Sequence, residues 1–329
     1  MSDERVSIVI PAYNAGRWVA RAIESALAQD WPDVEIIVVN DGSTDNTEEV
    51  CLAYGDRIRY FRQENRGVSA ARNRGIEAST GSLIGFLDAD DELMPHMVST
   101  LARALRRWPD AAAASGAFIH RTSAGTKRVP PMGVVLGGAR TEGLVDDFFS
   151  AYARWAIVWT GAVLVRREVL RQLGGFRTDL WMGEDQEMWS RIAGQYPWVF
   201  VDREIAVYNN LPHSSITMDS KAWIRSNFLS CLYLEEEMKE KIRPALFSSY
   251  RRFRRDRAVS YCRGLIVHGE VRRAREALGR VWPVPVNLSY FSMMLVSQLS
   301  PRVVVRLVGV ARRLRASARG FCARFGRRR

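Results

Sequence analysis

The sequence predicts an α/β protein in which a mixed, mostly parallel sheet carries helices on both faces, followed by a C-terminal helical extension. Over the first 120 residues, short apolar and β-branched runs alternate with stretches whose apolar residues recur at helical spacing. Such alternation is typical of βαβ units, whose strands are covered on both faces. A composition of 47% hydrophobic and 26% charged residues fits a folded globular chain and excludes a mainly disordered one.

The elements of this first region follow one another regularly. Short runs rich in Val, Ile and other apolar residues predict strands at residues 5–11, 34–41, 57–63, 83–90 and 111–118. Apolar spacing at i, i+3 and i+4 predicts helices at residues 18–29, 47–54, 68–78 and 95–108. Because ligands of such sheets gather at the carboxyl ends of the strands, the polar residues that stand there are candidate site residues.

The later part of the chain is expected to change from strands to helices. Residues 121–140 are rich in Gly, Pro, Ser and Thr and predict a long loop. A helix at 146–155, a strand at 162–166 and two short strands near a sheet edge, 199–201 and 205–208, are expected next. Amphipathic patterns then predict helices at 221–242, 244–264 and 270–280. The expected division is a domain at 1–220, a helical subdomain at 221–281 and an apolar, arginine-rich tail at 282–329.

The positive net charge is concentrated at the end of the chain. Of the total of +12, residues 301–329 contribute ten arginines and no acid, so the other 300 residues carry +2. A nearly neutral body without interleaved basic and aromatic residues argues against a nucleic-acid-binding protein.

Cysteine usage and hydropathy indicate a cytoplasmic location. The four cysteines show no CxxC spacing, which favours a reduced compartment. The apolar run Val6–Ala12 is too short for a signal peptide, and no window reaches the ~18–20 uncharged apolar residues of a clear membrane span.

The first chemical signal is the run Asp88-Ala89-Asp90-Asp91, which follows an apolar strand. Alternate carboxylates at a strand end can bind a hard divalent cation such as Mg²⁺ or Mn²⁺ through oxygen, and such a cation would bridge a diphosphate. The alternative is an acidic turn that caps the helix beginning near Pro95. A short motif of this kind does not decide between the two by itself.

The motifs around this run favour the metal site over the helix-capping turn, because together they resemble a known family. In chain order they are SIVIPAYN, VVNDGSTD, NRGVSAARNRGI, GSLIGFLDADD and, about 90 residues later, GEDQEMWSRI. Over residues 5 to roughly 215, this series resembles the inverting family-2 glycosyltransferases of the GT-A fold. The resemblance implies transfer of a sugar from a nucleotide-diphospho-sugar to an acceptor hydroxyl, assisted by Mg²⁺ or Mn²⁺.

The resemblance also implies roles for individual residues in donor binding. Asp41 would hydrogen-bond the base or ribose, and Arg72 would meet nucleotide or phosphate oxygens, with a surface salt bridge as the alternative. Asp88 would contact the ribose or the metal shell, and Asp90 would ligate the metal directly. The turn after the first strand would offer backbone groups to the base; its residues are Pro11, Ala12, Tyr13 and Asn14. Ala89, which lies between Asp88 and Asp90, completes the expected donor site.

The acceptor side is expected at Glu184 and Asp185, at the start of a helix. In the family pattern the aspartate is the general base that deprotonates the acceptor hydroxyl, and Glu184 would touch donor or acceptor hydroxyls; a plain helix start is the alternative. His213 lies where many relatives carry an H-x-x-S pattern, and would approach the metal or the diphosphate; a loop histidine that binds no ligand is the alternative. The Q-x-x-R-W element of processive relatives is absent, which favours transfer of one sugar per event.

The sequence argues against two other function classes. A sugar-1-phosphate nucleotidyltransferase shares the sheet type, but it would need a Gly-rich phosphate loop, and the chain has no GxG. A basic nucleic-acid-binding protein is disfavoured by the charge distribution.

The expected partners are a nucleotide-sugar donor, with a UDP-sugar favoured, a saccharide or lipid-linked acceptor, and no nucleic acid. Within the tail, Val303, Leu307, Val310 and Leu314 fall on one helical stripe beside arginines. This pattern is typical of a helix lying on an anionic membrane, so the tail is expected to hold the protein peripherally on the inner face of the cell membrane. A disordered or self-packed cationic tail is the alternative.

Overall fold

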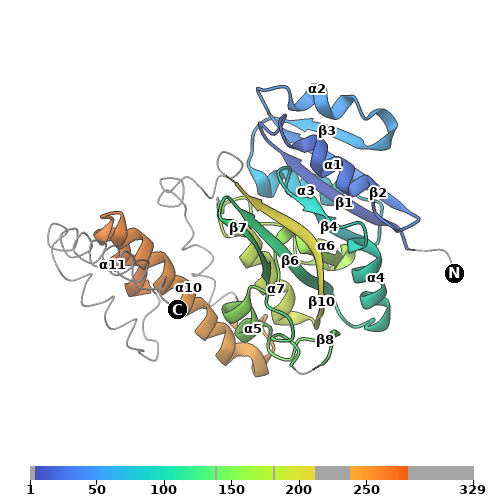
Figure 1. Ribbon diagram of the computed structural model, residues 1–329. Helices are drawn as coiled ribbons and strands as arrows, with labels where there is room; N and C mark the ends of the chain where they lie inside the picture. The colour runs from blue at the N-terminus through green and yellow to red at the C-terminus, as the bar shows by residue number, and fades with distance from the viewer. Residues whose placement is uncertain (1–3, 138, 181, 212–237, 281–329) are drawn as a thin grey trace, which may run out of the picture. The chain divides into compact units, whose positions relative to one another are not determined.

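The computed structural model describes residues 4–137, 139–180, 182–211 and 238–280 (Figure 1). The chain divides into two compact units, with the boundary at residues 253/254 inside one helix. Each unit is described by itself. Both boundaries of the expected three-part division, 220/221 and 281/282, fall outside the described residues, as do His213 and the tail.

The first unit is built on a ten-stranded mixed sheet with the order β3-β2-β1-β4-β9-β6-β10-β5, in which β7 pairs with β6 and β8 with β10. The N-terminal strands are parallel to one another: β1 (Val6–Ala12), β2 (Val34–Asp41), β3 (Arg59–Gln63) and β4 (Leu83–Phe86). Their carboxyl ends therefore meet at one edge of the sheet, as the sequence predicts for βαβ units.

The other strands extend this sheet with mixed directions. β9 pairs antiparallel with both β4 and β6, and β10 runs parallel to β6 while pairing antiparallel with β5 and β8. Their bounds are β5 (Glu92–Leu93), β6 (Ala113–Thr122), β7 (Gly125–Val129), β8 (Glu142–Leu144), β9 (Val163–Arg166) and β10 (Trp198–Asn210).

Helices cover both faces because strand residues alternate between two cores. Ile8 and Ile10 pack in one core, with α1 (Val19–Leu27), α2 (Thr47–Leu52) and α4 (Met97–Arg107). Val9 faces the other core, whose helices are α3 (Val68–Ala78), α5 (Phe148–Trp155), α6 (Arg167–Gln172), α7 (Glu184–Gln195) and the start of α10 (Pro244–Val267). The expected α/β fold class with helices on both faces is confirmed.

Two expectations about the second half of the sheet are wrong. Residues 121–140 are not all loop, since β7 pairs antiparallel with the end of β6 as a hairpin. The strands expected at 199–201 and 205–208 form one strand, β10, with register shifts between Val201 and Ala206. β10 lies next to the last strand of the order, the short β5, so its place near a sheet edge is as expected.

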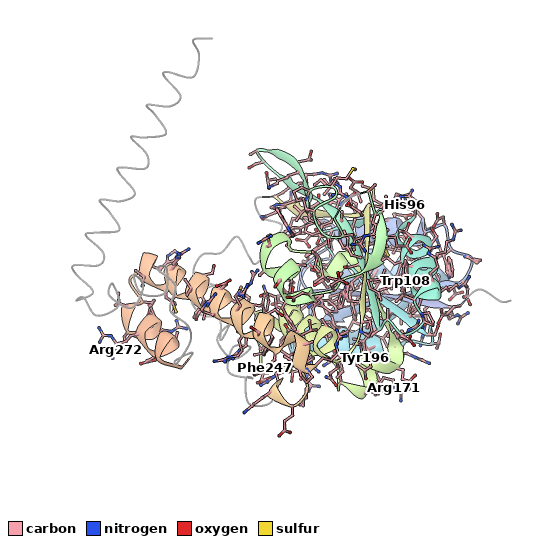
Figure 2. All side chains as sticks on the ribbon, turned by 90° about the horizontal axis from the view of Figure 1, so that it is seen from below. His96, Trp108, Arg171, Tyr196, Phe247 and Arg272 are labelled. Carbon is pink, nitrogen blue, oxygen red and sulfur yellow. The ribbon has the colours of Figure 1, made fainter. Side chains whose placement is uncertain are left out.

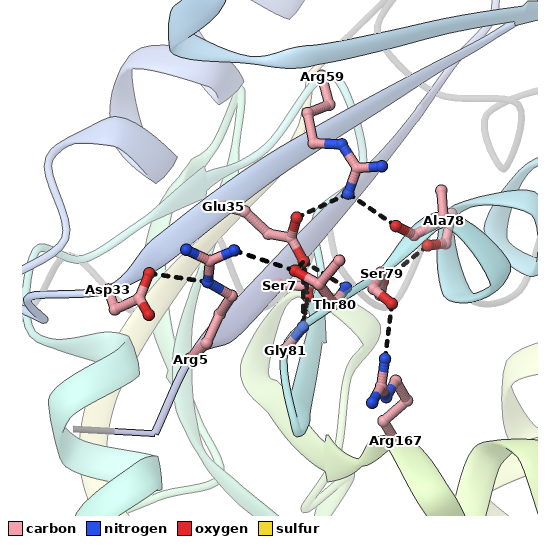
Figure 3. Close-up of polar contacts among 11 residues, drawn as sticks. Arg5, Ser7, Asp33, Glu35, Arg59, Ala78, Ser79, Thr80, Gly81 and Arg167 are labelled. Atoms are coloured by element: carbon pink, nitrogen blue, oxygen red, sulfur yellow. Dashed lines mark hydrogen bonds and ion pairs between the residues drawn. The ribbon is translucent and has the colours of Figure 1, made fainter. Parts of the chain in front are cut away.

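The amino ends of the strands, opposite the site edge, are tied by a polar cluster around Glu35 (Figure 3). Its Oε1 accepts hydrogen bonds from Ser7 Oγ (2.6 Å) and from the Thr80 N–H (2.6 Å), and its Oε2 pairs with Arg59 (2.8 Å). Burial opposes ionisation, but these donors outweigh it and lower the pKa of Glu35 to about 2. The cluster therefore stabilises the fold and is remote from the candidate site.

The second unit contains the C-terminal part of α10 and α11 (Val271–Arg280). Gly269, at φ +86°, and a hydrogen bond from the Glu270 N–H to the Leu265 carbonyl (2.8 Å) end α10. Apolar residues of both helices are buried, among them Tyr261, Leu265 and Ala274. No helix of the described residues is long and apolar enough to cross a membrane.

Candidate active site

The turn after β1 is fastened to the turn after β2. Asn14 has a φ of +48°, a left-handed conformation that asparagine tolerates better than most residues. Its N–H donates to Ser43 Oγ (2.9 Å), and its Oδ1 accepts from the Thr44 N–H (2.8 Å). The Ala15 N–H donates to Thr47 Oγ1 (2.8 Å). These bonds fix both turns at the carboxyl edge of the sheet.

The four residues expected to meet the base differ in accessibility. Pro11 and Ala12 close β1 and are buried, while the ring of Tyr13 is 48% exposed and Asn14 is exposed. Tyr13 is thus the large side chain of this turn that a ligand can reach.

Asp41 ends β2 and is almost fully buried, at 3% exposure. Its Oδ1 accepts from Gln63 Nε2 (2.7 Å) and the Arg66 N–H (3.0 Å), and its Oδ2 accepts from the Gly67 N–H (2.8 Å). Gly67, at φ +87°, precedes α3. Asp41 therefore shapes the turn that starts α3. Its Oδ1 already accepts two hydrogen bonds, whereas Oδ2 accepts one and has a lone pair left for a ligand.

Arg72 of α3 joins the two acidic motifs. It is 3% exposed; its Nη2 lies 2.8 Å from Asp88 Oδ1, and its Nη1 lies 2.7 Å from Glu184 Oε1. Glu184 is 112 residues away in sequence. The guanidinium therefore fixes the start of α7 next to the carboxyl end of β4, so that the residues expected on the donor and acceptor sides form one site.

The position of Arg72 is enforced by packing beneath it. Its guanidinium lies over the ring of Phe176, 5.3 Å from the ring centroid. Asn73 clamps that residue, with its Nδ2 donating to the Phe176 carbonyl and its Oδ1 accepting from the Phe176 N–H, each at 2.7 Å. Gly175 has a φ of +71°, and a Cβ there would lie 2.5 Å from Asn73 Oδ1, so the close approach requires glycine.

Asp88, Asp90 and Asp91 form a crowded set of carboxyls after β4. Burial raises the pKa of Asp90 to about 7, and the negative charge of Asp88 adds to the effect. Asp91 is fully buried; its Oδ1 accepts from the Asn209 N–H (2.7 Å), and its Oδ2 has no partner in the described part of the chain. Ala89, between them, is buried.

The backbone of this turn is held from two sides. The Asp90 carbonyl accepts from Arg21 Nη2 (2.6 Å) of α1 and from Asn209 Nδ2 (3.0 Å) of β10. Asn209 Nδ2 and Arg121 Nη1 also donate to Glu92 Oε1, at 3.1 and 2.9 Å. The main chain of the turn is therefore fixed independently of the Asp90 carboxyl.

These residues fit the divalent cation that the fold family implies. In the described residues, no group of three or more His, Cys, Asp and Glu side chains gathers into a site made by protein alone. Mg²⁺ usually takes one or two carboxylates and completes its shell with phosphate and water, so Asp88 and Asp90 provide a sufficient protein contribution. Burial, and after it the negative charge of Asp88, disfavours ionisation of Asp90, and a bound cation would favour the ionised form of both carboxyls.

Asp185 lies at the start of α7, beside Glu184. Burial raises its pKa to about 7, the charge of Glu184 adds to this effect, and Arg72 opposes it. Its Oδ1 accepts from the Gln186 N–H (2.7 Å). A carboxyl with a pKa near neutrality is suited to accept a proton during a reaction at neutral pH.

Some residues that build the site carried no recognisable signal of their own. Asn73, Phe176 and Asn209 act only through contacts with distant segments. The same holds for Arg191 of α7, whose Nη2 donates to the Gly175 carbonyl (2.7 Å) and which pairs with Glu187 (2.6 Å). The pair Gly174–Gly175 was the available clue, since two adjacent glycines with positive φ mark a tight turn.

Comparison with known proteins shows which family the chain is similar to. The model of the family described as glycosyl transferase family 2 matches residues 7–174. An uncharacterised glycosyltransferase of Escherichia coli K12, YibD, is 47% identical over 103 residues, which is 30% of this chain and 30% of that protein. Glycosyltransferase GlyG of Streptococcus pneumoniae is 41% identical over 103 residues, 30% of this chain and 34% of that protein. Each match thus spans about a third of the relative's length.

Solved structures share the fold over nearly the whole chain. S. aureus TarS 1-349 in complex with UDP-GlcNAc has a TM-score of 0.71 and 16% identity, and the match covers 94% of this chain and 92% of that one. The mannosyltransferase PcManGT of Pyrobaculum calidifontis in complex with GDP-Man and Mn²⁺ has a TM-score of 0.58 and 18% identity, covering 93% and 84%. The architecture is therefore the GT-A fold, as expected from the motifs.

Proposed function

Because the chain belongs to glycosyl transferase family 2, we propose that it transfers a sugar from a nucleotide-diphospho-sugar to an acceptor hydroxyl, with inversion at the anomeric carbon. The observation that carries the proposal is the double ion pair of Arg72, which holds Asp88 and Glu184 within one site. Direct displacement needs a leaving-group site and a base on opposite faces of the sugar, and the proposal assigns these roles to the two acidic motifs that Arg72 joins.

Asp185 is the proposed general base. The acceptor hydroxyl loses its proton to the Asp185 carboxylate as its oxygen forms a bond to the anomeric carbon, and the bond from that carbon to the diphosphate breaks with both electrons going to the leaving oxygen. The carboxylate must be ionised to act. A pKa of about 7 keeps it basic enough to take the proton while leaving it largely ionised above neutral pH.

Donor binding is assigned to the carboxyl edge of the parallel strands. Tyr13 provides an exposed ring beside the base, and Asp41 provides acceptor oxygens for the base or ribose. Asp90 and Asp88 would hold Mg²⁺ or Mn²⁺, which stabilises negative charge on the departing diphosphate when bound. Arg72 holds Asp88 in place from the protein side.

The substrates are proposed from the neighbours and the motifs. TarS in complex with UDP-GlcNAc and PcManGT in complex with GDP-Man support a nucleotide-sugar donor, and a UDP-sugar is favoured. We propose a saccharide or lipid-linked acceptor and one sugar per event, in surface polysaccharide or glycolipid assembly at the inner face of the cell membrane. His213 is proposed to approach the metal or diphosphate; it lies outside the described residues.

The test is a screen of the purified protein for nucleotide release from UDP-, GDP- and TDP-sugars, with MnCl₂ or with EDTA. We expect release from one class of donor with MnCl₂, loss of release in EDTA, and its recovery when metal is restored. Asp90→Ala should lack activity while its far-UV circular dichroism stays that of the parent. Full activity in EDTA would remove the metal from the mechanism, and inactivity with every donor would count against the function itself.

A further inference from the structure

The near-neutral charge of the first 300 residues conceals an asymmetry that follows the structural units. Residues 1–253 hold 30 basic and 33 acidic residues, a net charge of −3. Residues 254–280, the described part of the second unit, hold eight arginines, no lysine and three acidic residues, a net charge of +5. The helical unit is therefore positive in its own right, before the arginine-rich tail is counted.

Part of this charge lies on the surface of a folded helical pair. Tyr261, Cys262 and Leu265 of α10 are buried, as are Val271 and Ala274 of α11, and the Cys262 thiol contacts the Ala274 carbonyl at 3.6 Å. The apolar residues of α11 recur at three-residue steps and occupy one side of the helix.

The other side of α11 and the neighbouring part of α10 carry exposed arginines, Arg263, Arg272 and Arg275, which we call the arginine face (Figure 2 labels Arg272). Of the acidic residues of the unit, Asp256 pairs with Arg255 (3.2 Å), and Glu276 is exposed beside Arg275. The three arginines outnumber this carboxylate, so the exposed surface stays positive.

We propose that the arginine face is a docking surface for an anionic phospholipid bilayer. Arginine binds phosphate oxygens in a bidentate manner and is weakly hydrated, so three exposed guanidinium groups on a helical pair suit a layer of phosphate headgroups. The exposed positions carry charge and no large apolar side chain, so docking is electrostatic and reversible rather than insertion. A membrane is favoured over a nucleic acid because no exposed aromatic residue accompanies these arginines in the described helices.

The choice of a bilayer rests on the proposed function in one respect: a lipid-linked acceptor would present its hydroxyl groups at such a surface. The binding itself does not depend on catalysis. Each basic residue near an anionic surface contributes about fivefold in the partition coefficient, so removal of all three arginines should weaken binding about a hundredfold at low salt.

The experiment is flotation of the full chain with vesicles of phosphatidylglycerol and phosphatidylcholine, and with phosphatidylcholine alone. The test variant is Arg263→Gln/Arg272→Gln/Arg275→Gln. The matched control replaces three exposed arginines of the first unit, Arg103→Gln/Arg171→Gln/Arg203→Gln, so that the total charge is the same. Thermal melts establish that both variants are folded.

The expected result is that the parent and the control float with anionic vesicles at low salt, whereas the partition coefficient of the test variant, determined over a series of lipid concentrations, is about a hundredfold lower. Equal flotation of test and control variants would overturn the proposal, as would parent protein that binds a labelled RNA but no vesicle. Nucleotide release from a soluble donor, measured in the same preparations, separates the two claims. A variant that keeps release but loses flotation supports the docking surface, and a parent without release but with flotation tells against the proposed function alone.

Discussion

Replacement of Asp185 by Asn should stabilise the protein while abolishing its activity. Asp185 has an ordinary pKa of 3.8 that is raised to about 7 in the folded protein. The folded state therefore binds its proton more tightly than the unfolded state, and the free energy of unfolding falls as pH rises from about 4 to about 7. Asn cannot ionise, and it keeps an oxygen for the Gln186 N–H.

The magnitude follows from the shift of about three pKa units. At about 1.36 kcal/mol per unit, full ionisation costs at most about 4 kcal/mol, and since the Asp185 side chain is partly exposed to water, which screens its charge, we expect roughly 2 kcal/mol. The stability gain of Asp185→Asn should therefore be near zero at pH 4 and reach about 2 kcal/mol at pH 8.

The assay is urea unfolding of the parent and of Asp185→Asn between pH 4 and pH 8, in EDTA, with exposed Asp110→Asn as the control. The control should follow the parent at every pH. A difference between Asp185→Asn and the parent that does not change with pH, or that falls as pH rises, would refute the assignment of a strained, proton-accepting carboxyl.

Three further outcomes follow from the contacts. Glu35→Gln should lower the free energy of unfolding by about 3 kcal/mol at pH 7, because the pKa of Glu35 is lowered to about 2. The loss should fade as pH falls from about 4.5 to 2, which urea unfolding across that range measures, and a loss that does not change with pH would contradict the prediction. Arg72→Lys should lower kcat more than a hundredfold, because one ammonium cannot pair with both Asp88 and Glu184 as the planar guanidinium does; near-parent turnover would exclude the bridging role. The rate of nucleotide release should rise with pH about a midpoint near 7, as Asp185 ionises; a rate that falls over this range would contradict a base with that pKa.

Much of the site was predictable because strand ends converge. Apolar runs located β1, β2 and β4, and parallel strands bring their carboxyl ends to one edge, so Asp41 and Asp88 had to lie at that edge. The start of α7 at Glu184 was equally visible, since a glycine followed by acidic residues is a typical helix beginning.

The contacts that assemble the site were not predictable from local patterns. The pairing of Arg72 with Glu184 spans 112 residues and depends on how α7 is placed. The clamp of Asn73 on Phe176 likewise depends on tertiary structure, because neither residue type signals such a role by itself.

The two wrong predictions about the sheet, for β7 and for β10, have a common cause: polar residues weaken the hydrophobic pattern. β7 lies in a segment that the sequence predicts as loop because its first four residues, Gly125 to Arg128, are polar or exposed, so hydrophobic periodicity is weak on this hairpin. The sequence predicts two strands in place of β10 because the polar stretch around Asp202 and Glu204 interrupts the apolar residues, and the register shifts of β10 occur in that stretch.

The measurement that tests the account most directly is the anomeric configuration of the transferred sugar, determined by proton NMR of the product formed from the donor that the screen identifies. Transfer by a single displacement, with Asp185 taking the acceptor proton, predicts a product with the opposite configuration to the donor and stoichiometric release of the nucleoside diphosphate. A product with retained configuration would contradict the mechanism, and nucleotide release without any glycosylated product would contradict the transfer itself.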